Sequence, residues 1–292
     1  MAHASGDAPR APVESGPADR FDRGDAGGPG ATAFELSKWY FDLVADDGAA
    51  FIGYFATVRW RALRLHYQSV LLRNATGAVT TRSSWRSPRG PRATPALIAW
   101  ECAELQVRGT WIAQAPPISV RLLQGRTGTI DWHCVQPRAL VQVTLGGAEP
   151  LQGLGYAEVL RVTVPPWRLP MRTLRWGRFL GETDAFVWIE WQGPVARRIA
   201  YLNGREATPT EVGERRIVLA GGDVSLDLDD ACVLREGRLG KTAFRRLPRL
   251  ERWFPSSFIG IHERKWLSRG TLRRTGATPS AGWAIHEVVE WP

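Results

Sequence analysis

The chain has 292 residues, 44% of them hydrophobic and 23% charged, with a formal net charge of +9 at pH 7. This composition is typical of a globular protein, and no apolar run reaches the ~18 residues that a membrane-spanning helix needs. The basic residues are nearly all arginines spread along the chain, with lysine only at Lys38, Lys241 and Lys265; since no recognition motif accompanies them, we expect no nucleic-acid binding.

The first 33 residues differ in composition from the rest. They are mostly Gly, Ala, Pro, Asp and Arg, with few large apolar side chains. Such a segment cannot bury enough apolar surface to offset its chain entropy, so we predict a disordered tail over 1–33. It also lacks the apolar stretch of a signal peptide.

The cysteines and the net charge bear on localisation. Cys102, Cys134 and Cys232 form an odd and sparse set, which favours a reducing compartment over a disulfide scaffold. We therefore expect a cytoplasmic protein. The charge of +9 leaves a weak, peripheral association with an anionic membrane surface open.

A β-hairpin is predicted at 38–60. Two strand-like runs flank Asp46-Asp47-Gly48, and Asp-Gly between such runs is a strong hairpin signal. Because side chains alternate across a strand, one face carries Trp39, Phe41 and Leu43, and the other carries Tyr40, Asp42 and Val44. Asp42 is thus either a solvated residue of an edge strand or a carboxylate on an inner face.

The pattern after residue 62 is mostly period two, broken by turn-forming residues. We predict strands at 62–73, 78–85, 97–113, 118–123, 130–135, 140–145, 156–164, 186–191, 197–202, 216–219, 224–228, 265–274 and 283–291. Pro137 separates two of them, and a short helix is expected only at 247–254.

Many short strands joined by hairpin turns predict an all-β protein. The length favours two lipocalin-like barrels, or two curved antiparallel sheets, packed together. Gly153 and Gly155 mark a change in composition. We therefore expect an N-terminal lipocalin-like domain at 34–155 and a C-terminal one at 156–292.

Two landmarks carry a family resemblance. The first is Trp39-Tyr40-Phe41-Asp42, followed by Asp46-Asp47-Gly48; the second is Gly153-Leu154-Gly155-Tyr156 with Glu158 and the later pair Trp176-Gly177. With them the sequence resembles the hydroxyneurosporene synthase (carotenoid hydratase) family, which is related to tocopherol cyclase-like and Diels–Alderase-like proteins. The resemblance implies a tandem lipocalin-like architecture and a hydratase acting on an apolar isoprenoid. The sequence departs from the family where Glu158 replaces the usual Asp, a His is absent, and the Trp-Gly pair comes later.

Glu158 is the first candidate for a catalytic residue, and Asp42 is the second. On an extended strand Glu158 shares a face with Tyr156 and Leu160. Apolar surroundings raise the pKa of a carboxyl, and a carboxyl that is protonated at neutral pH can act as a general acid. The alternative is a structural ion pair with a nearby arginine, such as Arg175 or Arg178.

Aromatic and acidic residues supply the candidate ligand contacts. The chain has 14 tryptophans, and aromatic walls with a few polar groups are typical of a pocket for an apolar ligand. The candidate ligand-binding residues are Trp39, Tyr40, Tyr156, Trp176, Trp188, Glu190 and Glu287. No metal-ligand spacing of histidines and no nucleotide or nucleophile motif is present, so we expect no metal and no cofactor.

Two functions from different classes remain open. One is a cofactor-independent enzyme that protonates an isoprenoid-like or polyketide-like substrate and hydrates or cyclises it. The other is a non-catalytic carrier of an apolar small molecule. Convergence of two or more carboxyls in one cavity favours the enzyme, because an unpaired buried carboxyl is costly in a carrier.

Overall fold

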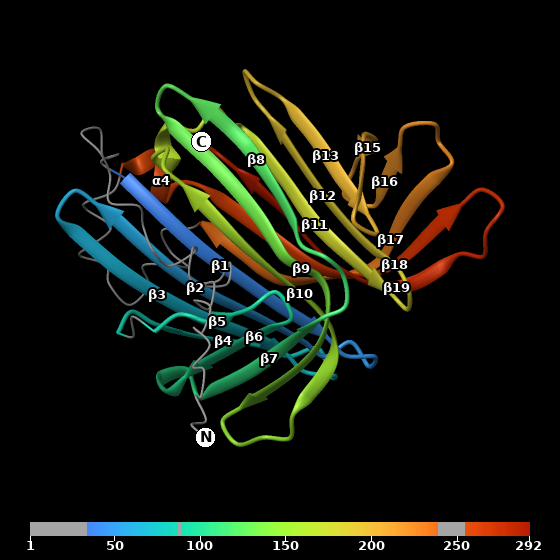
Figure 1. Ribbon diagram of the computed structural model, residues 1–292, viewed down its shortest axis with the longest axis horizontal. Coiled ribbons are helices and arrows are strands. Elements are labelled where there is room, and N and C mark those ends of the chain that lie inside the picture. Colours follow the sequence, from blue (N-terminus) through green and yellow to red (C-terminus); the bar gives the residue numbers. More distant parts are fainter. Residues whose placement is uncertain (1–33, 87–88, 239–254) are drawn as a thin grey trace, which may run out of the picture.

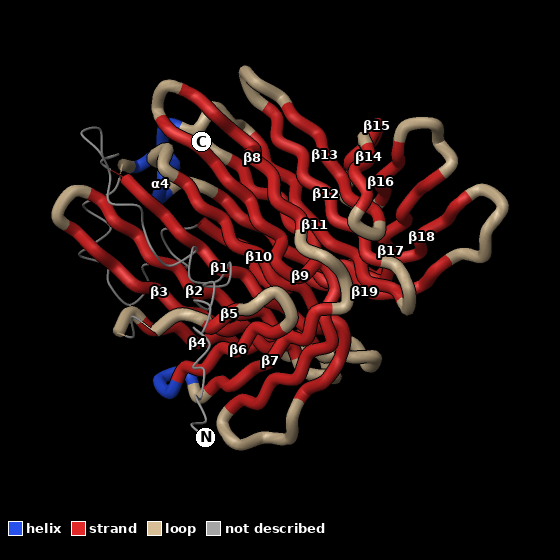
Figure 2. Tube along the Cα trace, viewed as in Figure 1, coloured by secondary structure: helices blue, strands red, loops and turns tan. Residues whose placement is uncertain are grey.

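The computed structural model describes residues 34–86, 89–238 and 255–292, and these residues are almost entirely antiparallel β structure (Figures 1 and 2). Two sheets, of ten and nine strands, pack against each other. The prediction of an all-β protein built from two lipocalin-like curved sheets is confirmed. The tail at 1–33 and the helix expected at 247–254 lie outside the described residues.

The first sheet contains every strand up to residue 162. Its strand order is β4-β3-β2-β1-β10-β9-β7-β6-β5, with β8 also paired to β9. The predicted hairpin is β1 and β2, turned at Gly48 with a φ of +82° that favours glycine. The elements are β1 (Phe34–Val44), β2 (Ala50–Trp60), β3 (Leu63–Arg73), β4 (Val79–Ser84), β5 (Arg92–Ala93), β6 (Leu97–Cys102), the 3-10 helix η1 (Ala103–Leu105), β7 (Val107–Ala113), β8 (Ile118–Gly125), β9 (Gly128–Leu145) and β10 (Leu151–Val162).

The second sheet contains the remaining strands in the order β14-β13-β12-β11-β19-β18-β17-β16-β15. In both sheets the first strand pairs with the last, β1 with β10 and β11 with β19. The elements are the 3-10 helix η2 (Pro166–Arg168), β11 (Thr173–Gly181), β12 (Ala185–Gln192), β13 (Arg197–Leu202), β14 (Arg205–Ala207), β15 (Pro209–Val212), β16 (Arg216–Leu219), β17 (Val224–Arg238), α4 (Ser256–Ile259), β18 (His262–Arg274) and β19 (Ser280–Glu290).

The strand break expected at Pro137 is wrong, because β9 runs through it without interruption. One edge of β9 is paired with β8 up to Cys134 and with β7 from Ala139, so residues 135–138 lie outside both ladders on that side, and there the Arg138 carbonyl accepts a hydrogen bond from Gln114 N. On the other edge the register with β10 shifts at the same place. A proline in a sheet is tolerated at a bulge or an unpaired edge, since it has no N–H to donate.

The chain passes from the first sheet to the second after the boundary that we expected at 155/156. That boundary falls inside β10. The change of sheet occurs at 163–172, around η2. Gly153 and Gly155 are strand residues that permit close approach to β1: a Cβ there would lie 2.2 Å from the Val44 carbonyl oxygen and 2.1 Å from that of Asp42. Gly153 and Gly155 therefore allow close packing of β10 against β1 and do not belong to a linker.

Strand alternation divides the apolar side chains among three cores. Trp39 and Phe41 of β1 point into the interior of the first sheet, whereas Tyr40 belongs to a core shared by both sheets. The second sheet has its own interior, which includes Trp188. The shared core also joins Ile189 to the first sheet, and burying each such side chain stabilises the fold by about 1.5–3 kcal/mol.

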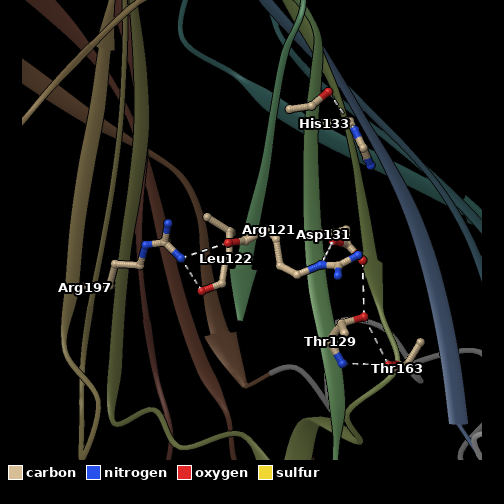
Figure 3. Close-up of polar contacts among 8 residues, drawn as sticks. Arg121, Leu122, Thr129, Asp131, His133, Thr163 and Arg197 are labelled. Atoms are coloured by element: carbon tan, nitrogen blue, oxygen red, sulfur yellow. Dashed lines mark hydrogen bonds and ion pairs between the residues drawn. The ribbon is translucent and has the colours of Figure 1, made fainter. Parts of the chain in front are cut away.

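Polar contacts also join the sheets. In Figure 3, Arg197 of β13 reaches across to β8 and donates hydrogen bonds to the carbonyl oxygens of Arg121 (2.9 Å) and Leu122 (2.6 Å). Arg121 in turn donates to Asp131 at 2.7 Å, and Asp131 accepts a bond from Thr129. No helix in the described part of the chain is both long and apolar enough to cross a membrane.

Candidate functional site

The candidate site consists of two rows of side chains that face each other in the shared core, and we call it the interface site. Antiparallel pairing places residues of neighbouring strands opposite each other on one face, so each row runs across its sheet. The row of the first sheet is Tyr54, Tyr40 and Glu158, on β2, β1 and β10. The row of the second sheet is Trp176, Glu287, Lys265 and Arg235, on β11, β19, β18 and β17.

The two rows touch through aromatic rings and cations. The rings of Tyr40 and Trp176 meet edge to face, with 5.0 Å between their centroids. The Lys265 ammonium lies 5.2 Å from the Tyr40 centroid and 5.3 Å from that of Trp176. The Arg235 guanidinium lies 5.4 Å from the Tyr54 ring. Ring faces attract positive charge, so these contacts stabilise the junction of the sheets.

Glu158 combines partial exposure with apolar surroundings. Its Oε2 accepts hydrogen bonds from Trp132 Nε1 (2.5 Å) and from the Tyr156 hydroxyl (2.6 Å). Within the described residues Glu158 forms no ion pair. The two arginines considered as its partners, Arg175 and Arg178, pair instead with Glu190 and Asp42. Burial raises the pKa of this carboxyl, and the two hydrogen bonds act in the opposite direction.

Asp42 forms a buried ion pair that links the two sheets, and its carboxyl is not accessible to a ligand. It is fully buried and accepts two hydrogen bonds from Arg178 of β11, at 2.7 and 3.0 Å, and one from Tyr40 at 2.9 Å. Burial raises the pKa of the Asp42 carboxyl, and the Arg178 guanidinium opposes this change. Arg178 also donates to the Trp283 carbonyl oxygen at 2.9 Å.

Lys265 and Glu287 form a buried ion pair at the centre of the second row. Burial acts to lower the pKa of Lys265, but Glu287, Tyr54 and Glu263 together outweigh it and the pKa is raised. Burial likewise acts to raise the pKa of Glu287, but Lys265, Lys38 and Arg235 together outweigh it and the pKa is lowered. Glu263 lies 4.0 Å from Lys265 and 3.8 Å from Arg235. Both partners therefore stay charged at neutral pH.

The structure brings four of the sequence-predicted residues into the interface site, Glu158, Tyr40, Trp176 and Glu287, and places two more, Asp42 and Tyr156, in hydrogen-bond contact with it. The other three lie elsewhere. Trp39 is in the interior of the first sheet and Trp188 in that of the second. Glu190 is buried among ion pairs with Arg175 and Arg198, away from the shared core. The cause is strand alternation, which points these three side chains to the opposite faces of their strands.

Sequence reasoning missed three residues of the interface site, Tyr54, Arg235 and Lys265, and Lys265 is the most informative of them. A signal was present in the sequence. Lysine is rare in this arginine-rich chain, and Lys265 shares one face of its strand with Glu263 and the apolar Leu267. A charged residue on an otherwise buried face requires a partner. Among the described residues no three His, Cys, Asp or Glu side chains are placed to hold a metal ion.

Comparison with known proteins shows the fold. No protein-family model and no curated protein sequence matches the chain. The structure is similar to CghA crystallised with Sch210972, with a TM-score of 0.57 and 12% identity over 88% of this chain and 89% of that one. It is also similar to kievitone hydratase from Nectria haematococca (TM-score 0.52, 10% identity, 89% of each chain). A putative AttH protein from Nitrosomonas europaea gives a TM-score of 0.51 and 12% identity over 89% of this chain and 94% of that one.

Proposed function

We propose that the interface site belongs to a cofactor-independent enzyme that protonates an apolar isoprenoid-like or polyketide-like substrate and so starts its hydration or cyclisation. One observation carries the proposal. Glu158 is a half-buried carboxyl in the shared core, without an ion-pair partner in the described residues, whose surroundings favour the protonated form. A carboxyl whose pKa is raised by burial is suited to general acid catalysis.

The hydrogen bonds of Glu158 orient the proton. Trp132 and Tyr156 both donate to Oε2, whereas Oε1 receives no hydrogen bond from the described residues. With Oε2 fixed as the acceptor, Oε1 carries the proton and presents it to the substrate. Transfer uses the π electrons of a carbon–carbon double bond to form a C–H bond, leaving a carbocation on the substrate and a carboxylate on Glu158.

Aromatic rings around Glu158 suit a cationic intermediate. Tyr40, Tyr156 and Trp176 form a contiguous group with ring centroids 5.0–6.0 Å apart. Ring faces attract positive charge by about 0.5–2 kcal/mol each. Water, or a second double bond of the substrate, then captures the cation. The Glu158 carboxylate accepts a proton at the end and is ready for the next cycle.

The comparisons support a chemistry of this class without identifying the substrate. One of the similar structures is a hydratase by its name, and the similarity covers 89% of both chains. The sequence resemblance to hydroxyneurosporene synthases points to the same reaction type. Because sequence identities are 10–12%, the substrate and reaction are our proposal for this chain.

The test is Glu158→Gln, with Glu35→Gln as a control at an exposed carboxylate of β1. Farnesol, farnesoic acid and squalene are incubated with each protein in D2O, and the products are analysed by mass spectrometry for deuterium and for added water. We expect product from the wild type and the control, and a loss of about 10²–10⁴-fold for Glu158→Gln at unchanged melting temperature. Turnover that survives Glu158→Gln would contradict the proposal.

A carrier function is the second candidate, and a pocket at the end of the first sheet favours it. The pocket has a volume of about 380 Å³, within the range of small-molecule sites. Val70, Val143 and Leu151 contribute apolar lining, and Arg73 and Arg82 contribute charge. None of the interface-site residues lines it. Binding of an apolar ligand that Val143→Trp blocks, with no turnover of any probe, would favour the carrier.

A further inference from the structure

We propose that the ligand of the interface site carries one acidic group, a carboxylate or an enolate, that binds beside Tyr54 between Lys38 of the first sheet and Arg235 of the second. This inference rests on the proposed function, because it describes the polar end of the same substrate. It makes the substrate an amphipathic acid rather than a hydrocarbon.

Three polar groups around Tyr54 have hydrogen-bonding capacity that the protein does not use. Lys38 Nζ lies 5.2 Å from the Tyr54 ring and forms no ion pair within the described chain. Arg235 lies 5.4 Å from the same ring, and its nearest carboxylate, on Glu263, is 3.8 Å away, beyond hydrogen-bonding distance. The Tyr54 hydroxyl has no hydrogen bond to any described residue. Two cations, Lys38 from the first sheet and Arg235 from the second, thus lie beside the Tyr54 ring, whose own hydroxyl is a further donor.

A buried donor in the facing row gives a second, independent indication. Trp176 Nε1 is completely enclosed and has no acceptor among the described residues. A buried N–H without an acceptor costs about 1–3 kcal/mol, so the missing acceptor requires an explanation. An oxygen-bearing ligand in the interface site supplies the missing acceptor.

The charge balance points to an anion. The interface site and the side chains next to it hold four cations and four carboxyls: Lys38, Arg178, Arg235 and Lys265, and Asp42, Glu158, Glu263 and Glu287. A protonated Glu158, which the proposed chemistry requires, leaves one positive charge in excess. Lys38 forms no ion pair within the described chain, and it interacts at longer range with the carboxyls of Glu158 and Glu287. Protonation of Glu158 removes one of these two charges, so the excess positive charge lies at Lys38, beside Tyr54. A singly charged anion restores the balance in a region of low dielectric.

The strand register sets the size of the ligand. Tyr54 and Glu158 flank Tyr40 in one row, so their backbones are separated by two interstrand spacings, about 10 Å. Lys38 is on β1, one spacing from Glu158, so the protonated carbon of the substrate lies about 5–10 Å from its acidic group, which is one to two isoprene units along an extended chain. The aromatic group at Tyr40, Tyr156 and Trp176 contacts the apolar part between them.

Farnesoic acid and farnesol form a matched pair of probes, since they differ only in a carboxylate against a hydroxymethyl group. Dissociation constants are measured by quenching of tryptophan fluorescence at pH 7. We expect the wild type to bind farnesoate at least about tenfold more tightly than farnesol, as a charge-assisted hydrogen bond contributes. Equal affinity for the two probes would overturn the inference.

Variants separate the subsite from a general charge effect. Lys38→Met should weaken farnesoate binding about tenfold and leave farnesol binding within about twofold. Arg108→Gln, which removes an exposed positive charge of β7, should change neither constant. If Lys38→Met weakens both probes equally at an unchanged melting temperature, the side chain has a packing role and the subsite is refuted. Arg235→Gln repeats the test from the second sheet.

The result is independent of catalysis. Glu158→Gln should abolish turnover yet keep the preference for farnesoate, because the acidic group binds to Lys38 and Arg235 and not to Glu158. Loss of turnover with no preference for the carboxylate refutes the subsite and leaves the proposed function intact. A preserved preference with turnover unaffected by Glu158→Gln refutes the proposed acid and leaves the subsite.

Discussion

Replacing Asp42 by asparagine should destabilise the protein more than any single change at the surface. The substitution keeps the shape of the side chain but leaves the Arg178 guanidinium charged, because arginine does not lose its proton in proteins. Both side chains are 0% exposed, so the charge has no access to water. Breaking one partner of such a pair costs about 3–5 kcal/mol, which lowers Tm by roughly 10 °C in a chain of this size.

Replacing the other partner of the pair, in Arg178→Met, should reduce the free energy of unfolding by less. Burial raises the pKa of the Asp42 carboxyl, so without its partner Asp42 can take up a proton and become neutral. The Tyr40 hydroxyl still donates to it at 2.9 Å. Asp42→Asn combined with Arg178→Met removes both charges, and we expect the double variant to be more stable than Asp42→Asn alone.

Urea unfolding of the three variants measures these differences. The control is the exposed pair Glu35–Arg59, in which Arg59→Gln should change the free energy of unfolding by less than about 1 kcal/mol. The reasoning is refuted if Asp42→Asn costs less than about 1 kcal/mol, or if Arg178→Met is the more damaging of the two single changes.

Two further predictions concern pH and close packing. His286 is buried, and burial lowers its pKa to about 4, so the unfolded chain, with the ordinary value of 6.5, binds the proton more tightly. The stabilising contribution of neutral His286 should therefore be complete above pH 6.5 and fall by about 2 kcal/mol at pH 5. In urea unfolding, His286→Gln should reduce the loss of stability between these pH values. An unchanged loss assigns the acid sensitivity to other groups. Gly155→Ala should destabilise by at least about 2 kcal/mol, because its Cβ would lie 2.1 Å from the Asp42 carbonyl oxygen, whereas Gly125→Ala, with no atom within 4 Å, should be near neutral in Tm.

The sequence was informative where local pattern alone decides the structure. Asp-Asp-Gly between two alternating runs predicts the β1–β2 hairpin, and alternation predicts that Tyr40 and Asp42 share a face. The same rule places Tyr156 and Glu158 on one face of β10, next to β1. Local pattern determines the face of a residue, and it places Tyr40, Asp42, Tyr156, Glu158 and Glu287 correctly.

Long-range information was missing where an element depends on partners from distant parts of the chain. The strand β11 was not predicted, because both of its faces mix arginine with apolar residues and show no period-two contrast. The contrast is lost because carboxylates from elsewhere neutralise the arginines: Asp42 of β1 pairs with Arg178, and Glu190 of β12 with Arg175. Which surface covers the face of Lys265 likewise depends on the packing of two sheets, which no local pattern encodes.

The pairing of first with last strand in each sheet governs how the protein folds. Tyr40 meets Glu158, and Trp176 meets Glu287, only after segments more than 100 residues apart have found each other. Contacts so distant along the chain require costly loop closure and form late, so folding should be slow and its last steps should be the two closures. Each closure also completes one row of the interface site. A chain that has folded only one half therefore has half a site and no catalytic constellation, and binding competence appears together with the native state.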